Sequence, residues 1–431
     1  MVALATLLAV CAAVVVVVLQ FAARLSHSLA AADPATVGYA TGTCKGLAFS
    51  LWFPIQPRPA LPYFSYLQGQ AGRPLPPWIP QGRTGHALAG LVLALAPRIF
   101  RSCAVGSTSA VDWRRRHTAA SGDVGRQASV GSGGLVIMVQ GFGAWTFIAA
   151  ELCEALASRG FAVAAIDLAR NEGVEARLAA VTALLDHILT EHSERFDPGK
   201  VVVVGHSRGG SQAAHLALSD PRVRGAVLLH SNSGDMQVLM RARPLPSQQA
   251  ASSAHATALL VVHATDDSAV RPEHHRAWVE LLRERTQGSG IWVRHALVDA
   301  PCGHNGCTSL LTMMSFAMPH WIVRVLSHLS RRISALQVLY PLGVTEPRAR
   351  QLVAITSEYI CDFVEAVLTP DDEGDLRRRG EGDSSEAQAC ATMCTNGSRG
   401  MQLFDGTAIW LHEAGYWRLR ENSESGSGST D

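Results

Sequence analysis

The chain has 431 residues, 48% of which are hydrophobic, and a formal net charge of +1. This length is enough for one large α/β domain with extensions or for two small domains. Phosphate backbones select surfaces dense in Lys and Arg, so the even balance of 37 basic and 36 acidic residues argues against a nucleic-acid partner.

The N-terminal segment, residues 1–32, is predicted to be a signal peptide or a membrane anchor. Before Arg24, its polar side chains are only Thr6 and Gln20. The apolar run is longer than the usual core of a signal peptide and lies near the lower limit of a bilayer-spanning helix, so cleavage and retention are both compatible with it. Either outcome predicts entry into the secretory pathway, as a secreted or a membrane-anchored protein.

Nine cysteines are present, one of them inside the apolar segment, and the other eight form an even count compatible with disulfides in an oxidising compartment. Cys302 with Cys307, and Cys390 with Cys394, are close enough in sequence to be candidates for local bridges. Cys153, in an apolar helical stretch, is expected to be a buried thiol.

Residues 40–368 are predicted to form one α/β domain with a loop insertion at about 105–134, which is polar and rich in Gly and Ser. A first strand is predicted at 45–54. From residue 135, short β-branched runs alternate with longer helical stretches, which indicates a mostly parallel sheet covered by helices on both faces. The expected strands are 135–139, 161–166, 201–204, 226–229, 259–263 and 292–298, and the expected helices are 146–158, 174–192, 211–218, 272–285 and one beginning near 308.

An amphipathic helix is predicted at 346–368, and residues 369–431 are predicted to be a linker and C-terminal extension with a low-complexity tail. The charged, Gly- and Ser-containing part of this extension is typical of a loop or disordered linker. The apolar stretch 401–419 is strand-like. A glycosylation sequon begins at Asn396, and it matters only if this loop enters the secretory lumen.

The strongest functional signal is the sequence Gly-His-Ser-Arg-Gly-Gly at residues 205–210, between a predicted strand and a predicted helix. At such a tight turn the serine is held in a strained backbone conformation with its hydroxyl above the sheet, and glycines allow the close backbone approach. The helix N-terminus favours developing negative charge. This context predicts that Ser207 is a nucleophile; the alternative is a glycine-rich turn at a strand end.

A serine hydroxyl needs a histidine base and a carboxylate that orients it, in the chain order serine, acid, histidine. Asp266 and Asp267 both follow the strand predicted at 259–263. Asp267 is preferred because Val270 and Pro272 follow it at the usual distance. The alternative role for either aspartate is a helix N-cap.

His304 is the candidate base, because it lies in a glycine-flanked loop after the last predicted strand. The chain has 17 histidines, so residue type alone does not select it, and His295, His274 and His275 are also candidates. A bridge between the neighbouring cysteines 302 and 307 would stiffen this loop, which is a hypothesis about preorganisation.

Acyl transfer also needs two donors for an oxyanion. The backbone N–H of Arg208, directly after the serine, is one candidate, and that of Phe142, in the loop after the strand at 135–139, is the other. Trp145 is a candidate for substrate binding, although such apolar residues more often belong to an ordinary core. The motifs imply neither a metal nor an organic cofactor.

The stretch 135–170, with Gln-Gly-Phe-Gly-Ala at 140–144, resembles the platelet-activating factor acetylhydrolases and related lipases of the α/β-hydrolase superfamily. The resemblance implies an α/β-hydrolase fold and a calcium-independent esterase that acts on short or oxidised acyl chains of phospholipids, at or near a membrane surface. Many relatives carry His where this chain has Gln140, a change that leaves the backbone donor in place.

The position of the acid departs from that family. The acetylhydrolases place it after the strand that follows the nucleophile helix, where this chain has His230. A carboxylate at Asp267 is instead similar to the arrangement in chlorophyllases, dienelactone hydrolases and cutinase-like polyester hydrolases, and the sequence at 205–210 is similar to that of chlorophyllases.

The sequence therefore predicts a serine carboxylic-ester hydrolase for a lipid-like or hydrophobic ester such as a short-acyl phospholipid, acting at a membrane surface. A thioesterase or peptidase on the same fold, and a non-catalytic, membrane-tethered binding protein, are the competing hypotheses. Nothing in the sequence indicates the oligomeric state.

Overall fold

The computed structural model describes residues 35–58, 105–106, 134–141, 146–168, 173–193, 195–231, 233–242, 257–264, 291–298, 303–308, 346–368 and 416–418, with shorter stretches between 266 and 311. The apolar N-terminal segment, nearly all of the loop insertion and most of the C-terminal extension lie outside these residues. The boundaries proposed for them, the sequon and the pair Cys390 and Cys394 therefore stay predictions.

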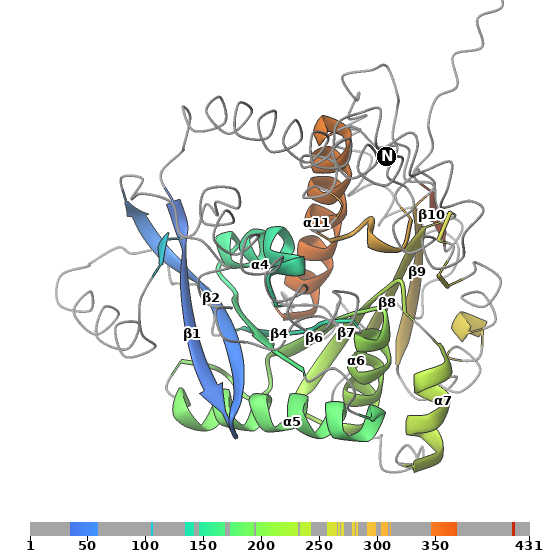
Figure 1. Ribbon diagram of the computed structural model, residues 1–431, viewed down its shortest axis with the longest axis horizontal. Helices are drawn as coiled ribbons and strands as arrows, with labels where there is room; N and C mark the ends of the chain where they lie inside the picture. The colour runs from blue at the N-terminus through green and yellow to red at the C-terminus, as the bar shows by residue number, and fades with distance from the viewer. Residues whose placement is uncertain are drawn as a thin grey trace, which may run out of the picture.

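The described residues form a sheet of ten strands in the order β10-β9-β8-β7-β6-β4-β5-β2-β1-β3 (Figure 1). Neighbours from β10 to β5 pair in parallel, whereas β2 pairs antiparallel with both β5 and β1. The strands are β1 Ala35–Cys44, β2 Leu47–Arg58, β3 Val105–Gly106, β4 Leu135–Val139, β5 Ala162–Ile166, β6 Val201–His206, β7 Val223–Leu229, β8 Ala258–Ala264, β9 Trp292–Val298 and β10 Tyr416–Arg418.

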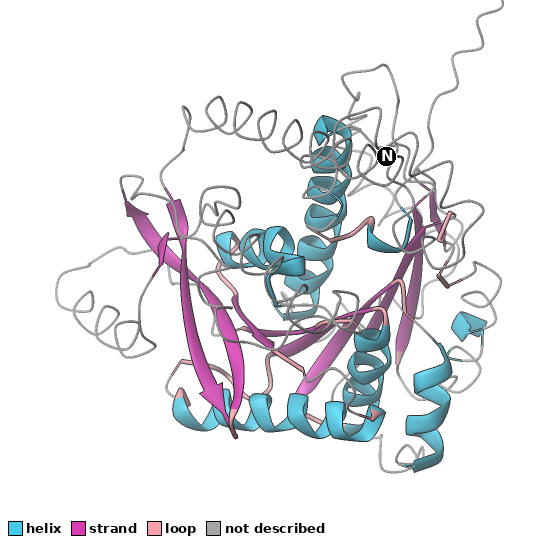
Figure 2. Ribbon diagram, in the orientation of Figure 1, coloured by secondary structure: helices cyan, strands magenta, loops and turns pink. Residues whose placement is uncertain are grey.

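Helices cover both faces of the sheet (Figures 1 and 2). One face packs against α4 (Ala150–Ser158) and α11 (Glu346–Leu368), and the other against α5 (Val174–Glu191), α6 (Arg208–Ser219) and α7 (Ser233–Ala242). Because both faces are covered, β4, β5, β6 and β8 are buried along their whole length, which explains their nearly continuous apolar sequences. The predicted fold class, a mostly parallel sheet flanked by helices, is confirmed.

The N-terminal part of the sheet differs from the prediction. One strand was expected at 45–54, but Lys45 and Gly46 form the turn between the antiparallel strands β1 and β2. Their φ angles are 49° and 80°, and two consecutive positive values are typical of the tight hairpin turn that matches the twist of its strands. The small residues and glycines of β1 give a weak strand signal, which is why the sequence did not reveal this strand.

One further element was not assigned from the sequence, and another was predicted only as a strand-like stretch. The helix α7 begins with Ser233 and Gly234, which are poor helix formers, and it was not predicted. In the apolar stretch at 401–419, residues Tyr416–Arg418 form β10, which pairs in parallel with β9 at the edge of the sheet. Of the helix predicted at 272–285, residues 278–280 and 282 are described, and they are helical.

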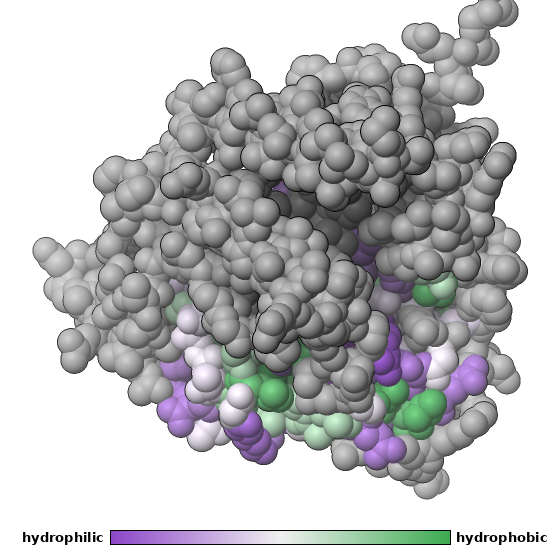
Figure 3. Space-filling model, in the orientation of Figure 1, coloured by the Kyte–Doolittle hydropathy of each residue, from purple (hydrophilic) through white to green (hydrophobic). Residues whose placement is uncertain are grey.

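Hydrophilic and hydrophobic residues are interspersed on the described surface near α5 and α7 (Figure 3). Val238 on α7 is the one exposed large hydrophobic side chain in the described part of the chain. Within the same residues, no helix has the length and apolar character needed to cross a bilayer.

Candidate active site

The carboxyl ends of β6, β7 and β8 meet at one edge of the parallel sheet, where sites in α/β proteins are usually built. Ser207 follows β6, His230 follows β7, and Asp267 lies shortly after β8. A short 3-10 helix after β9, Gly303–Asn305, brings His304 to the same edge.

Ser207 occupies the turn between β6 and α6 with φ 54° and ψ −118°, a conformation that side chains rarely adopt. The turn is possible because the backbones of β6, α6 and β4 are in direct contact, with no side chains between them. A Cβ on Gly205 would collide with the carbonyl of Gly209, and a Cβ on Gly209 would collide with the carbonyl of Val139. Gly205 and Gly209 of the predicted motif therefore let strand, turn and helix approach closely enough to hold the serine in place.

The structure brings Ser207, His304 and Asp267 together. Oγ of Ser207 lies 2.9 Å from Nε2 of His304. Nδ1 of His304 lies 2.9 Å from Oδ2 and 3.2 Å from Oδ1 of Asp267. Because a carboxylate only accepts, Nδ1 of His304 donates its proton to Asp267, and the neutral ring is left with an acceptor at Nε2 that faces the serine hydroxyl. This arrangement allows His304 to take the hydroxyl proton of Ser207.

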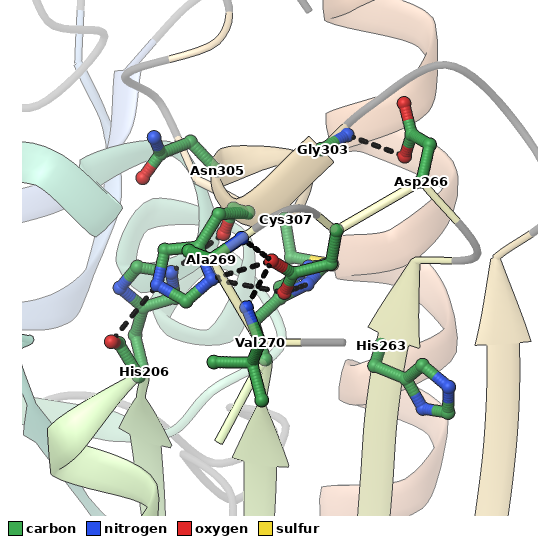
Figure 4. A network of polar contacts seen from close by, with 12 residues as sticks. His206, His263, Asp266, Ala269, Val270, Gly303, Asn305 and Cys307 are labelled. Atoms are coloured by element: carbon green, nitrogen blue, oxygen red, sulfur yellow. Dashed lines mark hydrogen bonds and ion pairs between the residues drawn. The ribbon is translucent and has the colours of Figure 1, made fainter. Parts of the chain in front are cut away.

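The adjacent aspartates have different partners. Asp267 is 2% exposed, and its Oδ1 accepts the backbone N–H groups of Ala269 and Val270, each at 2.9 Å. Oδ1 of Asp266 accepts the backbone N–H of Gly303 at 2.8 Å, and Figure 4 shows its side chain turned away from the histidines. Asp267 is thus the aspartate that contacts His304, and Asp266 holds the loop in which His304 lies.

The electrostatics of the site favour an ionised Asp267. Burial opposes its ionisation, but the hydrogen bonds from His230 and His304 outweigh this effect and hold its pKa well below the usual range. Asp267 can therefore carry a negative charge beside His304 across the physiological pH range.

A second imidazole also contacts Asp267. Nδ1 of His230 lies 3.2 Å from Oδ2 of Asp267, and Nε2 of His230 lies 3.2 Å from Sγ of Cys307. Cys307 is a buried free thiol, and burial raises its pKa to about 12. The candidate bridge between Cys302 and Cys307 is therefore not formed in the structure, which has Cys307 as a free thiol.

His206, directly before the nucleophile, supports the loop of His304. Its Nε2 donates a hydrogen bond to the backbone carbonyl of His304 at 3.0 Å. Burial, together with the neighbouring rings of His304 and His230, lowers the pKa of His206 to about 3. The ring is consequently neutral and acts as a fixed hydrogen-bond donor.

The loop after β4 approaches the nucleophile closely. A Cβ on Gly141 would lie 3.1 Å from Cβ of Ser207, so the backbone at this point passes directly beside the serine. The preceding residue, Gln140, is held at both ends: its carbonyl accepts from the buried guanidinium of Arg177 at 2.6 Å, and its side-chain amide donates to the carbonyl of Thr146 at 3.0 Å. The predicted residues Phe142 and Trp145 follow in this loop and lie outside the described residues.

Arg208 is the first residue of α6, so its backbone N–H lies at the N-terminal end of that helix beside Ser207. Its guanidinium forms an ion pair with Asp235 of α7 at 2.6 Å. The candidate base His295 is placed elsewhere: it is buried on β9, where its Nε2 lies 2.6 Å from Nδ1 of His263. The candidates His274 and His275 lie outside the described residues.

The polar atoms at the site also have a spacing that could hold a metal ion. Ligand atoms of His230, Asp267 and His304 all lie within 4.8 Å of one another. Two imidazoles and a carboxylate are a ligand set that zinc accepts. Hydrogen bonds from both Nδ1 atoms to the shared carboxylate also account for this closeness.

Comparison with known proteins places this geometry in a family. Residues 136–358, which are more than half of the chain, match the model of the alpha/beta hydrolase family. The chain belongs to this family. The matched region begins in β4 and ends within α11, so it contains Ser207, Asp267 and His304.

Individual relatives of this alpha/beta hydrolase include two cutinases of Thermobifida alba, est1 and est2. Each is 36% identical over 85 residues, a stretch that covers 19% of this chain and 29% and 28% of the two cutinases. The match thus spans less than a third of either relative. A ferulic acid esterase from Streptomyces cinnamoneus has a similar structure, with a TM-score of 0.48 and 22% identity over 83% of this chain and 96% of the esterase.

Sequence reasoning missed the contacts of His206 and His230 in this hydrolase. The motif at 205–210 placed His206 beside the nucleophile, but no spacing rule links it to a carbonyl near residue 304. His230 was noticed only as the residue that stands where the acetylhydrolases have their acid. A polar residue directly after a buried strand was the available signal, since such positions lie at the edge where the site is built.

Proposed function

We propose that this protein is a serine carboxylic-ester hydrolase with Ser207 as its nucleophile. The observation that carries the proposal is the 2.9 Å contact between Oγ of Ser207 and Nε2 of His304, made from a strained turn at the carboxyl edge of the sheet. In the first step, Ser207 Oγ attacks the ester carbonyl carbon while His304 takes the hydroxyl proton.

The tetrahedral intermediate then collapses. His304 returns the proton to the departing alkoxide, which leaves as an alcohol, and Ser207 is left as an acyl ester. A water molecule repeats the sequence: it gives a proton to His304, attacks the acyl carbon and releases the carboxylic acid, and Ser207 recovers its proton. Asp267 stabilises the imidazolium of His304 in both halves and is not itself protonated.

The oxyanion is assigned to the backbone N–H groups of Arg208 and Phe142. Support for the first comes from the position of Arg208 at the start of α6, where the helix N-terminus favours negative charge. Support for the second comes from Gly141, whose backbone passes beside Ser207 immediately before Phe142. The N–H of Arg208 belongs to the backbone at the start of α6, so it needs no reorganisation during the reaction.

The proposed substrate is a hydrophobic, lipid-like ester, with a short-acyl phospholipid as one member of the class. The similarity to cutinases supports an ester in preference to an amide or thioester. Trp145, four residues after Gly141 in the sequence, is the proposed contact for the acyl group. An N-terminal apolar segment at 1–32 would place such an enzyme in the secretory pathway at a membrane surface.

Hydrolysis of matched substrates tests the proposal. The purified chain is given an ester, a thioester and an amide of the same acyl group, together with p-nitrophenyl esters and short-chain phosphatidylcholines. We expect the ester to be cleaved fastest, with a loss in kcat of at least about 10³-fold in Ser207→Ala. Faster thioester or amide cleavage would change the assigned class, and equal rates for Ser207→Ala and wild type would refute the mechanism.

A further inference from the structure

We propose that His230 is a positioning residue for this site: its neutral ring donates from Nδ1 to Asp267, so that one carboxylate is shared between two imidazoles. The proposal rests on the proposed ester hydrolysis, because it concerns how Asp267 acts on His304. His230 follows β7, whereas Asp267 follows β8, so the contact joins two neighbouring strand ends.

The contacts of Asp267 fix the plane of its carboxylate. Oδ1 accepts the backbone N–H groups of Ala269 and Val270, and Oδ2 accepts from the two rings at 2.9 and 3.2 Å. The backbone N–H groups of the loop hold Oδ1, and His230 shares Oδ2 with His304. Without His230, Oδ2 would keep His304 as its one ring donor, and rotation of the carboxylate would move the ring that faces Ser207.

The tautomer of His230 follows from its partners. The side chain is completely buried, and this burial lowers its pKa, so the ring is neutral and has a single N–H. The carboxylate of Asp267 can only accept, which places that proton on Nδ1. Nε2 is then an acceptor, and the thiol of Cys307, whose pKa is raised to about 12 by burial, donates to it. Cys307 thus holds His230 in the tautomer that contacts Asp267.

The backbone of His230 supplies an independent observation. Its φ is 49°, so it shares with Ser207 a conformation that non-glycine residues rarely adopt. Its N–H donates to the carbonyl of Val262 at 2.8 Å, which continues the pairing of β7 with β8 up to this residue. Strained residues persist where the surroundings require them, and they gather at functional sites. Here the strained turn directs the imidazole toward Asp267.

The titratable groups around His230 determine what its loss would do. The groups facing it are Asp267 and Cys307, in direct contact, and the rings of His206 and His304, whose centroids lie 6.1 and 5.8 Å away. Removal of the Nδ1 donor of His230 would leave more negative charge on the oxygen of Asp267 that contacts His304. This charge favours the protonated form of the His304 ring. The acidic limb of the kcat/KM profile should therefore move to higher pH.

Two amide variants separate the two ring nitrogens. In His230→Asn, the amide lies near the position of Nδ1 and can still donate to Asp267, and asparagine tolerates positive φ better than most residues. In His230→Gln, the amide lies near the position of Nε2, toward Cys307. Both variants are compared with wild type for kcat, KM and the pH profile on a p-nitrophenyl ester, and active enzyme is counted by titration with a fluorophosphonate.

We expect His230→Asn to keep kcat within about 3-fold of wild type and to keep the acidic limb. We expect His230→Gln to lose about 10- to 100-fold in kcat with little change in KM, and to move the limb to higher pH. A wild-type kcat and limb in His230→Gln would overturn the proposal. Equal losses in both variants with no movement of the limb would also overturn it, because they would indicate a purely structural role.

A second variant keeps the test open if His230→Gln does not fold. Cys307→Ala removes the donor to Nε2 and so weakens the preference of His230 for the Nδ1 tautomer, and kcat should fall about 3-fold or more with the same movement of the limb. Cys307→Ser restores a donor and should restore the profile; identical behaviour of the two cysteine variants would contradict the proposal. If wild type itself neither cleaves esters nor reacts with the fluorophosphonate, the proposed function has failed instead.

Discussion

At the scale of single residues, two adjacent aspartates have different roles: Asp267 contacts the ring of His304, and Asp266 holds the loop in which His304 lies. Asp266 and Asp267 follow the same strand, and a preference for Asp267 could be predicted from the spacing to Val270 and Pro272. In the structure, Asp267 is the aspartate that contacts His304. The role of Asp266 could not be predicted, because its contact with Gly303 depends on where a loop 37 residues away comes to lie.

His206 leads to a prediction about stability and pH. Its pKa is lowered to about 3 by burial and by the nearby rings of His304 and His230, whereas an unfolded chain binds a proton at His206 near pH 6.5. Between these two pH values the unfolded state binds more protons than the folded state. The contribution of His206 to the free energy of unfolding is therefore fully present above about pH 6.5 and is lost as the pH falls. The variant His206→Gln keeps a donor near Nε2 but does not titrate. Between about pH 7 and pH 5, its free energy of unfolding should therefore fall by about 2 kcal/mol less than that of the wild type.

The measurement is urea unfolding of the variant and of wild type at both pH values. Parallel losses of stability in the two proteins would show that His206 is already neutral in the unfolded chain or charged in the folded one, and would contradict this reading of the site.

At the scale of elements, the turn from β6 to α6 depends on backbone contact with β4. Gly209 lies within α6, where alanine would ordinarily stabilise a helix by about 1 kcal/mol. A Cβ there would collide with the carbonyl of Val139, and backbone cannot move aside cheaply. We therefore expect Gly209→Ala to destabilise the protein despite the gain in helix propensity, and to lower the Tm by at least about 5 °C.

Gly173→Ala is the matched control for this prediction. Gly173 precedes α5 with φ −61°, and a Cβ there would meet no atom within 4 Å. The Tm of Gly173→Ala should differ from that of the wild type by no more than about 2 °C. A Tm for Gly209→Ala equal to or above that of wild type would mean that the close approach of β4 and α6 is not required.

The elements themselves differed in how well they could be predicted. The buried strands β4, β6 and β8 and the helices α5 and α11 were predicted near their observed bounds, because apolar runs and helical periodicity follow directly from burial on one or both sides. β1 and α7 were not predicted, since small residues, glycine and serine give no periodic signal. Their structure comes from pairing and packing with segments distant in the chain.

At the scale of the whole molecule, the central claim is that three segments converge. Ser207 and His304 lie 97 residues apart in sequence, and Asp267 and His304 lie 37 apart. The meeting of these residues could be predicted because parallel strands place their carboxyl ends at one edge. The second imidazole on Asp267 could not be predicted, because it depends on a strained turn after β7 and on a cysteine beyond β9.

Covalent labelling of Ser207 tests this convergence most directly. The folded chain, the urea-unfolded chain and the variant His304→Ala are treated with a fluorophosphonate, and the modified peptide is identified by mass spectrometry. An isolated serine hydroxyl is a weak nucleophile, so we predict an adduct on Ser207 in the folded wild type and almost none in the other two samples. An adduct on another residue, or equal labelling of Ser207 in all three samples, would contradict the account.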